Sequence, residues 1–92
     1  VFRLEKYQIV KPARAGSAES NDCLVIISPF EDLEIEISSE VAKQYGSEIE
    51  RVVRETLSDL GVDKAQIKLE DKGALDFTIR ARVEAAVKRG AK

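Results

Sequence analysis

Few residues in this chain could perform chemistry, and their types point away from catalysis. The 92 residues include no histidine, which excludes a Ser-His or Cys-His catalytic pair and every histidine metal ligand. The one cysteine, Cys23, cannot form a disulfide within the chain, and it opens an apolar segment where a free thiol is usually a buried side chain. We therefore expect no catalytic residue and no metal site, and the lone thiol favours a reducing, cytoplasmic setting.

Two acidic pairs and two arginines offer other chemistry, but each has a simpler interpretation. Glu31–Asp32 and Glu70–Asp71 lie beside predicted turns, where solvated charges are favoured over paired acids for proton transfer or metal binding. Arg80 and Arg82 could bind a phosphate through their planar guanidinium groups. A solvated helix face with i,i+4 ion pairs is favoured instead, through Arg80, Glu84 and Lys88.

A serine hydroxyl in a predicted loop is the remaining candidate. Residues 11–22 (KPARAGSAESND) are poor in large apolar side chains and rich in turn formers, so they predict an exposed, flexible loop that contains Ser20. With no base beside it, this hydroxyl is a poor nucleophile but a good acceptor for a group attached by another enzyme. From the residues alone, the commoner interpretation of Ser-Asn-Asp is a turn whose side chains bond nearby backbone.

The loop must be carried by a folded body, and hydrophobic periodicity predicts its strands. Residues 2–10 could form an N-terminal edge strand that ends before Pro12. Residues 23–28 (CLVIIS) form a continuous apolar run, typical of a central strand, and residues 33–38 alternate like a half-buried one. We expect these two to pair as an antiparallel hairpin. Residues 66–70 (QIKLE) predict a third, short strand.

Two helices are predicted by apolar residues at three- and four-residue steps. The first ends at Gly61, a suitable left-handed cap, and begins either near residue 39 or at a restart at Gly46, where Ser47 and Glu50 could form a capping box. The second has an apolar stripe with Asp76 at its start: Leu75, Ile79, Val83, Ala86 and Val87.

These elements predict one domain over residues 1–92 with an α+β fold. We expect a two-layer sandwich, in which two helices lie on one face of a small mixed or antiparallel sheet, with a split βαβ-like connection.

Charge and hydropathy exclude further classes of function. The formal net charge is −2, with acids concentrated in residues 19–59 and bases in residues 80–92. An acidic balance with 5% aromatic residues argues against nucleic-acid binding, so we interpret the opposite charges as helix faces that attract each other or a protein partner. No apolar run approaches the ~18 residues of a membrane span, and the charged N-terminal stretch resembles neither a signal peptide nor an anchor.

Two separated motifs resemble a known family. AGSAESND at residues 15–22 and DKGALDFTIRARVEAAVKR at residues 71–89, in this order and with a similar segment between them, resemble the acyl carrier protein (gamma) subunit of citrate lyase. The family's pattern is closer to Ala-Gly-Thr-Leu-Glu-Ser, so Ser17 and Ala18 depart from it while the acceptor Ser20 is kept. The resemblance covers residues 15–89.

The resemblance implies a carrier rather than a catalyst. In that family the serine matched by Ser20 bears 2'-(5''-phosphoribosyl)-3'-dephospho-CoA, attached by a dedicated transferase. Its thiol holds acetyl and then citryl while the alpha (acyl transferase) and beta (citryl lyase) subunits convert citrate to oxaloacetate and acetate. Residues that would flank the attachment in the loop are Gly16, Glu19, Asn21 and Asp22.

Two hypotheses concern the charges and turns around this site. Glu19 and Asp22 would keep the arm off the body by like-charge repulsion with its phosphodiester. A second group of residues, far from Ser20 in sequence, would serve subunit docking or internal salt bridges: Asp71, Lys72, Gly73, Arg80 and Arg82.

Other functions stay open on the sequence. The carrier of citramalate lyase or malonate decarboxylase would use the same arm. Because the carrier does not itself recognise the acid, its sequence does not distinguish these functions. An alternative of another class is an unmodified interaction or structural module in which Ser20 is only a turn residue.

Overall fold

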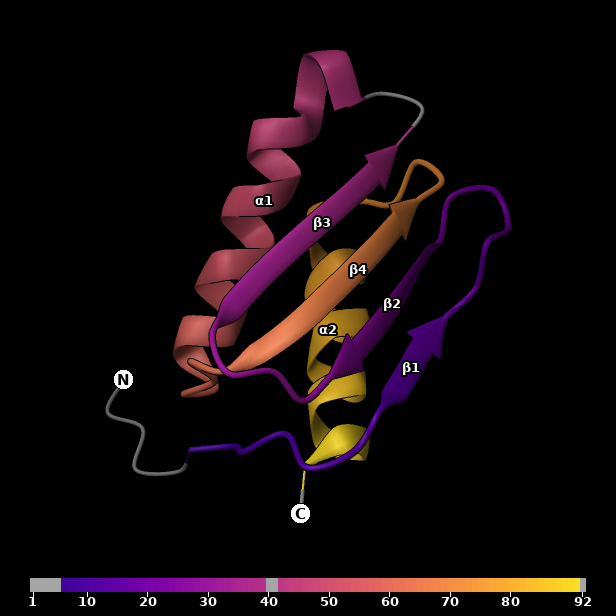
Figure 1. Cartoon of the computed structure of the whole chain (residues 1–92). Coiled ribbons are helices and arrows are strands. Elements are labelled where there is room, and N and C mark those ends of the chain that lie inside the picture. Colours follow the sequence, from indigo (N-terminus) through magenta and orange to yellow (C-terminus); the bar gives the residue numbers. More distant parts are fainter. Residues whose placement is uncertain (1–5, 40–41, 92) are drawn as a thin grey trace.

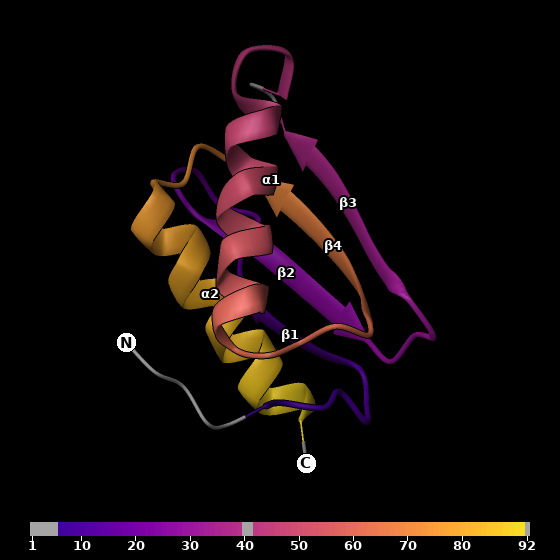
Figure 2. The same cartoon turned by 90° about the vertical axis from the view of Figure 1, so that its left-hand side faces the viewer.

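The computed structural model describes residues 6–39 and 42–91, and in these ranges it contains four strands and two helices. Both helices cover one face of the sheet and leave the other face open (Figures 1 and 2). This arrangement confirms the predicted two-layer α+β fold. In chain order, the elements are β1 (Ala13–Gly16), β2 (Cys23–Ser28), β3 (Leu33–Ser39), α1 (Ala42–Asp59), β4 (Ala65–Asp71) and α2 (Asp76–Gly90).

The strand order β1-β2-β4-β3 shows that the predicted hairpin of residues 23–28 and 33–38 is wrong. Strand β4 lies between them, antiparallel to β2 and parallel to β3. In this central position Ile67 and Leu69 are buried, whereas Leu33, Ile35 and Ile37 of the edge strand β3 are only half-buried. The hairpin of this fold is instead formed by β1 and β2, which pair antiparallel.

The connection β3-α1-β4 joins two strands that are direct neighbours and parallel, so the βαβ unit is not split as predicted. Helix α1 also continues through Gly46, which makes the predicted restart and the Ser47–Glu50 capping box wrong. A glycine inside a helix costs about 1 kcal/mol. The buried stripe that α1 packs against the sheet offsets this cost, and it consists of Ile49, Val52, Val53 and Leu57.

The end of α1 follows the prediction. Gly61 has a φ of +70°, and the amide of Val62 donates to the Leu57 carbonyl at 2.9 Å while that of Gly61 donates to Ser58 at 3.0 Å. These two hydrogen bonds form a Schellman cap, which needs a left-handed residue at Gly61.

Helix α2 begins at Asp76, and its predicted apolar stripe is buried at Ile79, Val83, Ala86 and Val87. Leu75 was expected to belong to this stripe, but it precedes the helix as its N-cap and is 62% exposed. The apolar spacing in the sequence therefore begins at Leu75, four residues before Ile79, the first residue of the stripe that is buried. Within the described ranges, neither helix has the length and apolarity of a membrane span.

The N-terminal segment differs from its prediction. Residues 1–5 lie outside the described residues, and residues 6–10 form no strand, since only Ile9 makes an isolated bridge, to Ala91. Within residues 11–22, expected to be a loop throughout, β1 forms and leaves residues 17–22 as the connection to β2. Small side chains let β1 pair closely with β2 and bury Ala15.

Candidate attachment site

The loop of residues 17–22 projects from one end of the sheet, between β1 and β2 (Figure 1). Gly16 enters the loop with a φ of +92°, and Asn21 leaves it with a φ of +68°. Both values lie in the left-handed region, which glycine and, less readily, asparagine adopt. The chain therefore reverses its direction through these two residues, both of which were predicted to flank the attachment in the loop.

The tip of the loop presents Ser20 to solvent. Ala18, Glu19 and Ser20 are all exposed, and the Ser20 hydroxyl has no hydrogen-bond partner in the part of the chain that the structure describes. A free hydroxyl on a turn can be reached by the active site of a modifying enzyme without local unfolding. The structure thus leaves the predicted acceptor accessible.

The base of the loop is fastened to the body through Asp22. Its carboxylate accepts hydrogen bonds from Ser17 Oγ at 2.8 Å, from the Cys23 amide at 2.7 Å and from Arg82 Nε at 2.9 Å. A second guanidinium nitrogen of Arg82, Nη2, approaches the other carboxylate oxygen at 3.3 Å. Arg82 follows Asp22 by 60 positions in the sequence. A bidentate interaction of this kind fixes the orientation of the guanidinium and carboxylate groups as well as the distance between them.

This contact changes the role proposed for Asp22. Hydrogen bonds from Arg82, Ser17 and the Cys23 amide lower the pKa of Asp22 to about 2, so the carboxylate is ionised but neutralised by Arg82. Like-charge repulsion between Asp22 and an attached arm is therefore weakened. The main role of Asp22 is to hold the base of the loop against α2 through Arg82. Glu19, which is exposed at the tip, keeps an unpaired charge among the described residues.

The Asp22–Arg82 pair should make stability depend on acidity. Because the folded pKa of Asp22, about 2, lies below the ordinary 3.8, the pair stabilises the fold above pH 3.8 and loses this contribution as pH falls towards 2. Arg82 is 40% exposed, so water screens the pair and we expect about 1 kcal/mol rather than the full linkage value. Asp22→Asn should show this loss in urea unfolding at neutral pH, with the difference from the unmodified sequence vanishing near pH 2.

A double-mutant cycle isolates the contact. Arg82→Gln should cost a similar free energy, and adding it to Asp22→Asn should cost little more. Full additivity of the two costs at neutral pH would contradict a direct interaction.

The turn after β4 lies against the same loop. The Asn21 amide donates to the Lys72 carbonyl at 2.7 Å, and the Lys72 amide donates to the Asp22 carbonyl at 2.9 Å. Gly73, with a φ of +92°, lies so close that a methyl group there would be 3.5 Å from Asn21 Oδ1. Lys72, Gly73 and Arg82, predicted from distant parts of the chain, are thus brought together beside the Ser20 loop.

Arg80 is not part of this cluster. Its guanidinium approaches Glu55 at 3.3 Å and Asp59 at 3.5 Å, both on α1. Both arginines therefore make internal salt bridges, the second of the two roles considered for them. Of the ion pairs predicted within α2, the one between Glu84 and Lys88 is present at 3.1 Å.

Asp71 differs from its prediction as a solvated turn charge. The residue is only 2% exposed, and its carboxylate accepts hydrogen bonds from Ser39 Oγ at 2.9 Å and from the Ala74 amide at 2.9 Å. These bonds join the end of β3 to the turn before α2. Asp71 is therefore a buried structural residue that holds β3 and this turn together at one end of the sheet.

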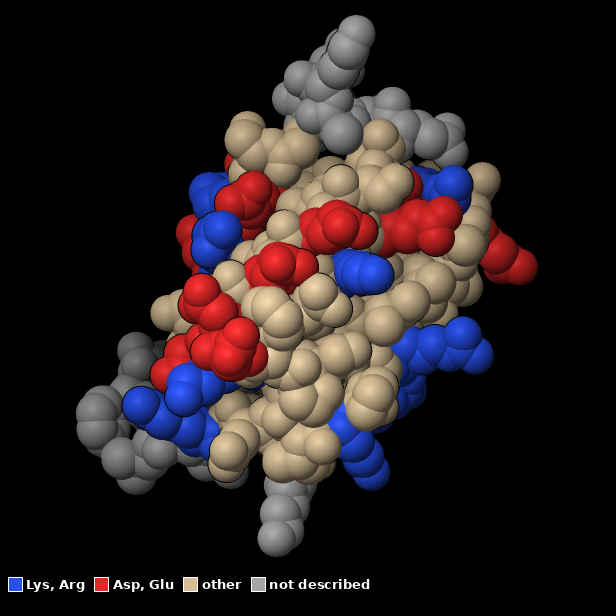
Figure 3. All heavy atoms as spheres, in the orientation of Figure 1, with Lys and Arg blue, Asp and Glu red and all other residues tan. Residues whose placement is uncertain are grey.

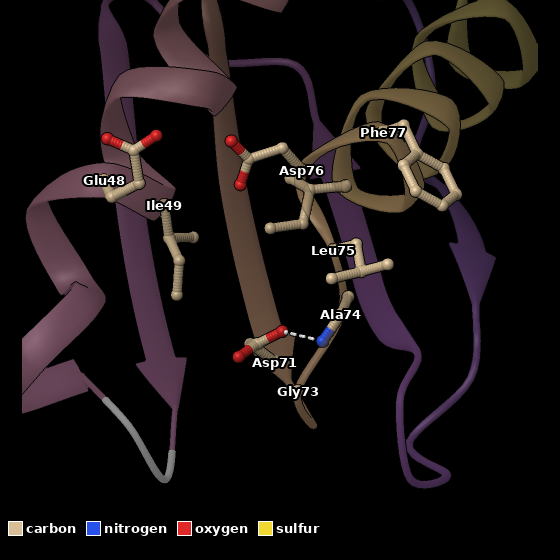
Figure 4. A pocket seen from close by; sticks show the side chains of 9 residues that line it. Glu48, Ile49, Asp71, Gly73, Ala74, Leu75, Asp76 and Phe77 are labelled. Atoms are coloured by element: carbon tan, nitrogen blue, oxygen red, sulfur yellow. Dashed lines mark hydrogen bonds between the residues drawn. The ribbon is translucent and has the colours of Figure 1, made fainter.

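A groove that the sequence did not predict lies next to this turn. It encloses about 630 Å³ between the first described turns of α1 and the start of α2, and Figure 4 shows Leu75 and Phe77 at its border. Phe77 is 70% exposed and Leu75 62%. One available signal was that Phe77 is an aromatic residue outside the apolar stripe of α2. The lining residues are Glu48, Ile49, Asp71, Gly73, Ala74, Leu75, Asp76, Phe77 and Ile79.

Cys23 lies at the start of β2 with no exposed surface, as expected for a structural thiol. Burial raises its pKa to about 12, and the Asp22 and Asp71 carboxylates act in the same direction. We therefore expect the folded chain to react with a disulfide reagent at about pH 8 more than about 1,000-fold more slowly than a free thiol, because the thiolate is the nucleophile. The same chain in concentrated guanidinium chloride is the control. Rapid labelling of the folded chain would contradict this burial.

Comparisons with known proteins identify relatives of this chain. Residues 10–90 match the family described as "ACP: Malonate decarboxylase delta subunit (MdcD)". A citrate lyase acyl carrier protein of Haemophilus influenzae is 54% identical over 82 residues, covering 89% of this chain and 86% of the relative. The citrate lyase acyl carrier protein of Clostridium perfringens is 50% identical over 84 residues, covering 89% and 83%.

A solved structure supports the fold independently. A chain in the crystal structure of a Pseudomonas malonate decarboxylase hetero-tetramer in complex with malonate superposes with a TM-score of 0.76, covering 96% of this chain and 93% of that one. The identity is 24%, so the comparison concerns the fold alone. From the family match and the relatives near 50% identity, together with the exposed serine loop, we conclude that the chain belongs to the acyl carrier protein family of citrate lyase and malonate decarboxylase.

Proposed function

We propose that this chain is the acyl carrier subunit of a citrate lyase and that Ser20 is its attachment residue. The observation that carries the proposal is the exposed Ser20 hydroxyl, free of partners among the described residues, at the tip of a loop whose base is fastened by Asp22 and Arg82. A carrier needs such a combination, because the arm must move while its point of attachment keeps a defined place on the body.

The residues around Ser20 fit a 2'-(5''-phosphoribosyl)-3'-dephospho-CoA group joined through a phosphodiester. The exposed tip leaves room for a large substituent, and Ala18, which belongs to this tip, has a small side chain. Since Arg82 neutralises Asp22, the new negative charge would face Glu19 as its one unpaired acidic neighbour in the loop. When bound, the group would supply a terminal thiol that holds acetyl or citryl as a thioester.

In this proposal the chain itself is not the catalyst. The sequence has no histidine, Cys23 is buried, and within the described ranges no three acidic or cysteine side chains are grouped to hold a metal ion. Catalysis would belong to an alpha subunit that transfers the acyl group and a beta subunit that cleaves citryl, after a transferase has loaded Ser20. The complex would work in the cytoplasm, where the single thiol stays reduced.

The acid handled by the complex has a competing candidate. The matching family is described by malonate decarboxylase, and the superposed chain comes from that enzyme. Citrate is favoured because relatives named for citrate lyase reach 54% identity, whereas the malonate decarboxylase chain reaches 24%. Citramalate lyase would use a similar carrier, and an unmodified interaction module remains the alternative from another class.

Reconstitution with catalytic subunits separates these candidates. The loaded chain should restore oxaloacetate formation from citrate when it is added to the alpha and beta subunits of a citrate lyase, and unloaded chain should not. Citramalate and malonate, the latter with malonate decarboxylase subunits, serve as matched assays. Restored malonate decarboxylation with no citrate cleavage would replace the proposed acid, and no activity with any of them would favour the interaction module.

A further inference from the structure

Two exposed apolar side chains border the groove at the start of α2. Leu75 is 62% and Phe77 70% exposed, both line the groove, and Figure 4 shows them on the same border of it, where α2 begins. Exposed aromatic and aliphatic side chains beside a concavity are typical of binding surfaces, because their burial provides most of the energy at protein interfaces. We call Leu75, Phe77 and the groove they border the Leu75–Phe77 patch.

Local stability does not explain Leu75. It occupies the N-cap of α2, a position that favours Ser, Thr, Asp or Asn, and it makes no side-chain hydrogen bond to the helix. A leucine here offers the first helix amides no side-chain acceptor and exposes an apolar side chain as well. The residue is therefore unfavourable for the isolated fold on two counts.

The patch lies at the end of the molecule that carries Ser20. Figure 1 shows the turn between β4 and α2 beside the loop between β1 and β2. The hydrogen bond from the Asn21 amide to the Lys72 carbonyl, 2.7 Å long, joins these two segments directly. Lys72 precedes Leu75 by three residues, so a protein that takes up a group attached to Ser20 would pass close to the patch.

Charge identifies the kind of partner. The solvent-accessible acids that line the groove are Glu48 and Asp76, beside the buried Asp71, and none of its described lining residues is Lys or Arg. Arg51 reaches both Glu48 and Asp76, the latter at 3.9 Å, and leaves the border of the groove net negative. The open face of the sheet, on the other side of the molecule from the helices, also carries acidic side chains across its upper part, and Lys and Arg predominate along its lower margin (Figure 3).

From these observations, and on the basis of the carrier function proposed above, we propose that the Leu75–Phe77 patch docks on a catalytic subunit of the lyase complex. The complementary surface would be an apolar pocket bordered by Lys or Arg beside the entrance of that subunit's active site. A second copy of this chain is a poorer occupant, since a two-fold interface would bring Glu48 and Asp76 against acids of the same patch. The anionic arm is disfavoured for the same reason.

The test compares two patch variants with one matched control. Leu75→Ser and Phe77→Ser alter the patch, and Phe30→Ser alters another exposed phenylalanine, 39% accessible, in the turn between β2 and β3 at the opposite end of the sheet. Binding of each full chain to the immobilised catalytic subunits is measured by surface plasmon resonance. Each patch variant should raise the Kd by about tenfold or more. The Kd of Phe30→Ser should stay within about twofold of that of the unsubstituted chain. Raising the salt concentration should weaken binding of the unmodified sequence.

Leu75→Ser adds a second readout that a merely structural role would not produce. Serine is a better N-cap, so this variant should unfold at a higher temperature than the unmodified sequence while it binds more weakly. Unchanged Kd for both patch variants would overturn the proposal. So would a loss of binding that only accompanies unfolding, or a patch-dependent dimer in sedimentation.

A further variant separates this proposal from the carrier function. Ser20→Ala removes the attachment hydroxyl but leaves the patch intact, so it should bind the catalytic subunits within about twofold of the unmodified chain. If Ser20 proves not to be loaded while the patch variants still lose binding, the carrier function fails and the docking surface stands. If loading is confirmed and the patch variants bind normally, the docking surface alone fails.

Discussion

Replacing Ser20 by alanine should abolish loading of the chain and, with it, activity of the reconstituted complex. The hydroxyl oxygen is the proposed attachment atom and alanine has none, so we expect a loss of more than about 1,000-fold, down to the background of the assay. Because Ser20 is exposed and makes no hydrogen bond to the described residues, the variant should keep the stability of the unmodified chain within about 0.5 kcal/mol. Loading is measured by intact mass, and activity by oxaloacetate formation.

Ser58→Ala is the matched control for this experiment. Ser58 is also exposed, but it lies near the end of α1, at the opposite end of the molecule from the loop. The Ser58→Ala chain should be loaded with the group and should be as active as the chain without any substitution. Activity retained by Ser20→Ala would show that another residue carries the group.

The largest structural effect is expected from Gly16→Ala. A methyl group at Gly16 would lie 1.9 Å from the Cys23 carbonyl oxygen, and the φ of +92° is unfavourable for any L-residue with a side chain. The clash is with backbone of the paired strand, so it cannot be relieved by rotating a side chain. We expect a loss of about 4 kcal/mol in the free energy of unfolding, measured by urea denaturation.

Gly73→Ala provides the comparison. Its φ is also +92°, but the nearest atom to an added methyl group is Asn21 Oδ1 at 3.5 Å, an ordinary contact. Conformational strain alone remains, so we expect a cost of about 1–2 kcal/mol. Equal costs for the two substitutions would show that the close approach of Gly16 to Cys23 is unimportant.

The positions of most elements could be predicted because the signal is local. The strands around 23–28, 33–38 and 66–70 and the two helices follow from apolar periodicity, and the Gly61 cap follows from one residue type. Apolar periodicity cannot predict a strand that lacks large apolar side chains and is held by its backbone hydrogen bonds to a neighbouring strand. Strand β1 was missed for this reason, because it is made of small residues and one arginine (ARAG) and its stability comes from pairing with β2.

The order of the strands could not be read in the same way. The periodicity of residues 33–38 and 66–70 shows which faces are apolar but not which strand lies beside which. Adjacent segments suggested a hairpin, whereas the structure places β4 in the centre, between β2 and β3, with Ile67 and Leu69 buried under the helices. This outcome depends on the packing of the whole sheet.

The exposed loop around Ser20 could be predicted from the sequence, whereas its surroundings could not, and attachment at Ser20 itself stays a prediction. A resemblance over separated motifs predicts the serine as the acceptor, and turn chemistry placed it in a loop. The contact between Asp22 and Arg82 joins residues 60 positions apart, and the exposure of Leu75 depends on where α2 begins. Neither has a signal within a short stretch of sequence.

Intact mass followed by peptide mapping of the chain, purified from its native host during growth on citrate, would test the attachment at Ser20 most directly. The carrier function predicts an adduct with the mass of the phosphoribosyl dephospho-CoA group on the peptide that contains Ser20, and on no other peptide. An unmodified Ser20 in cells that are actively cleaving citrate would contradict the carrier function and favour an interaction module.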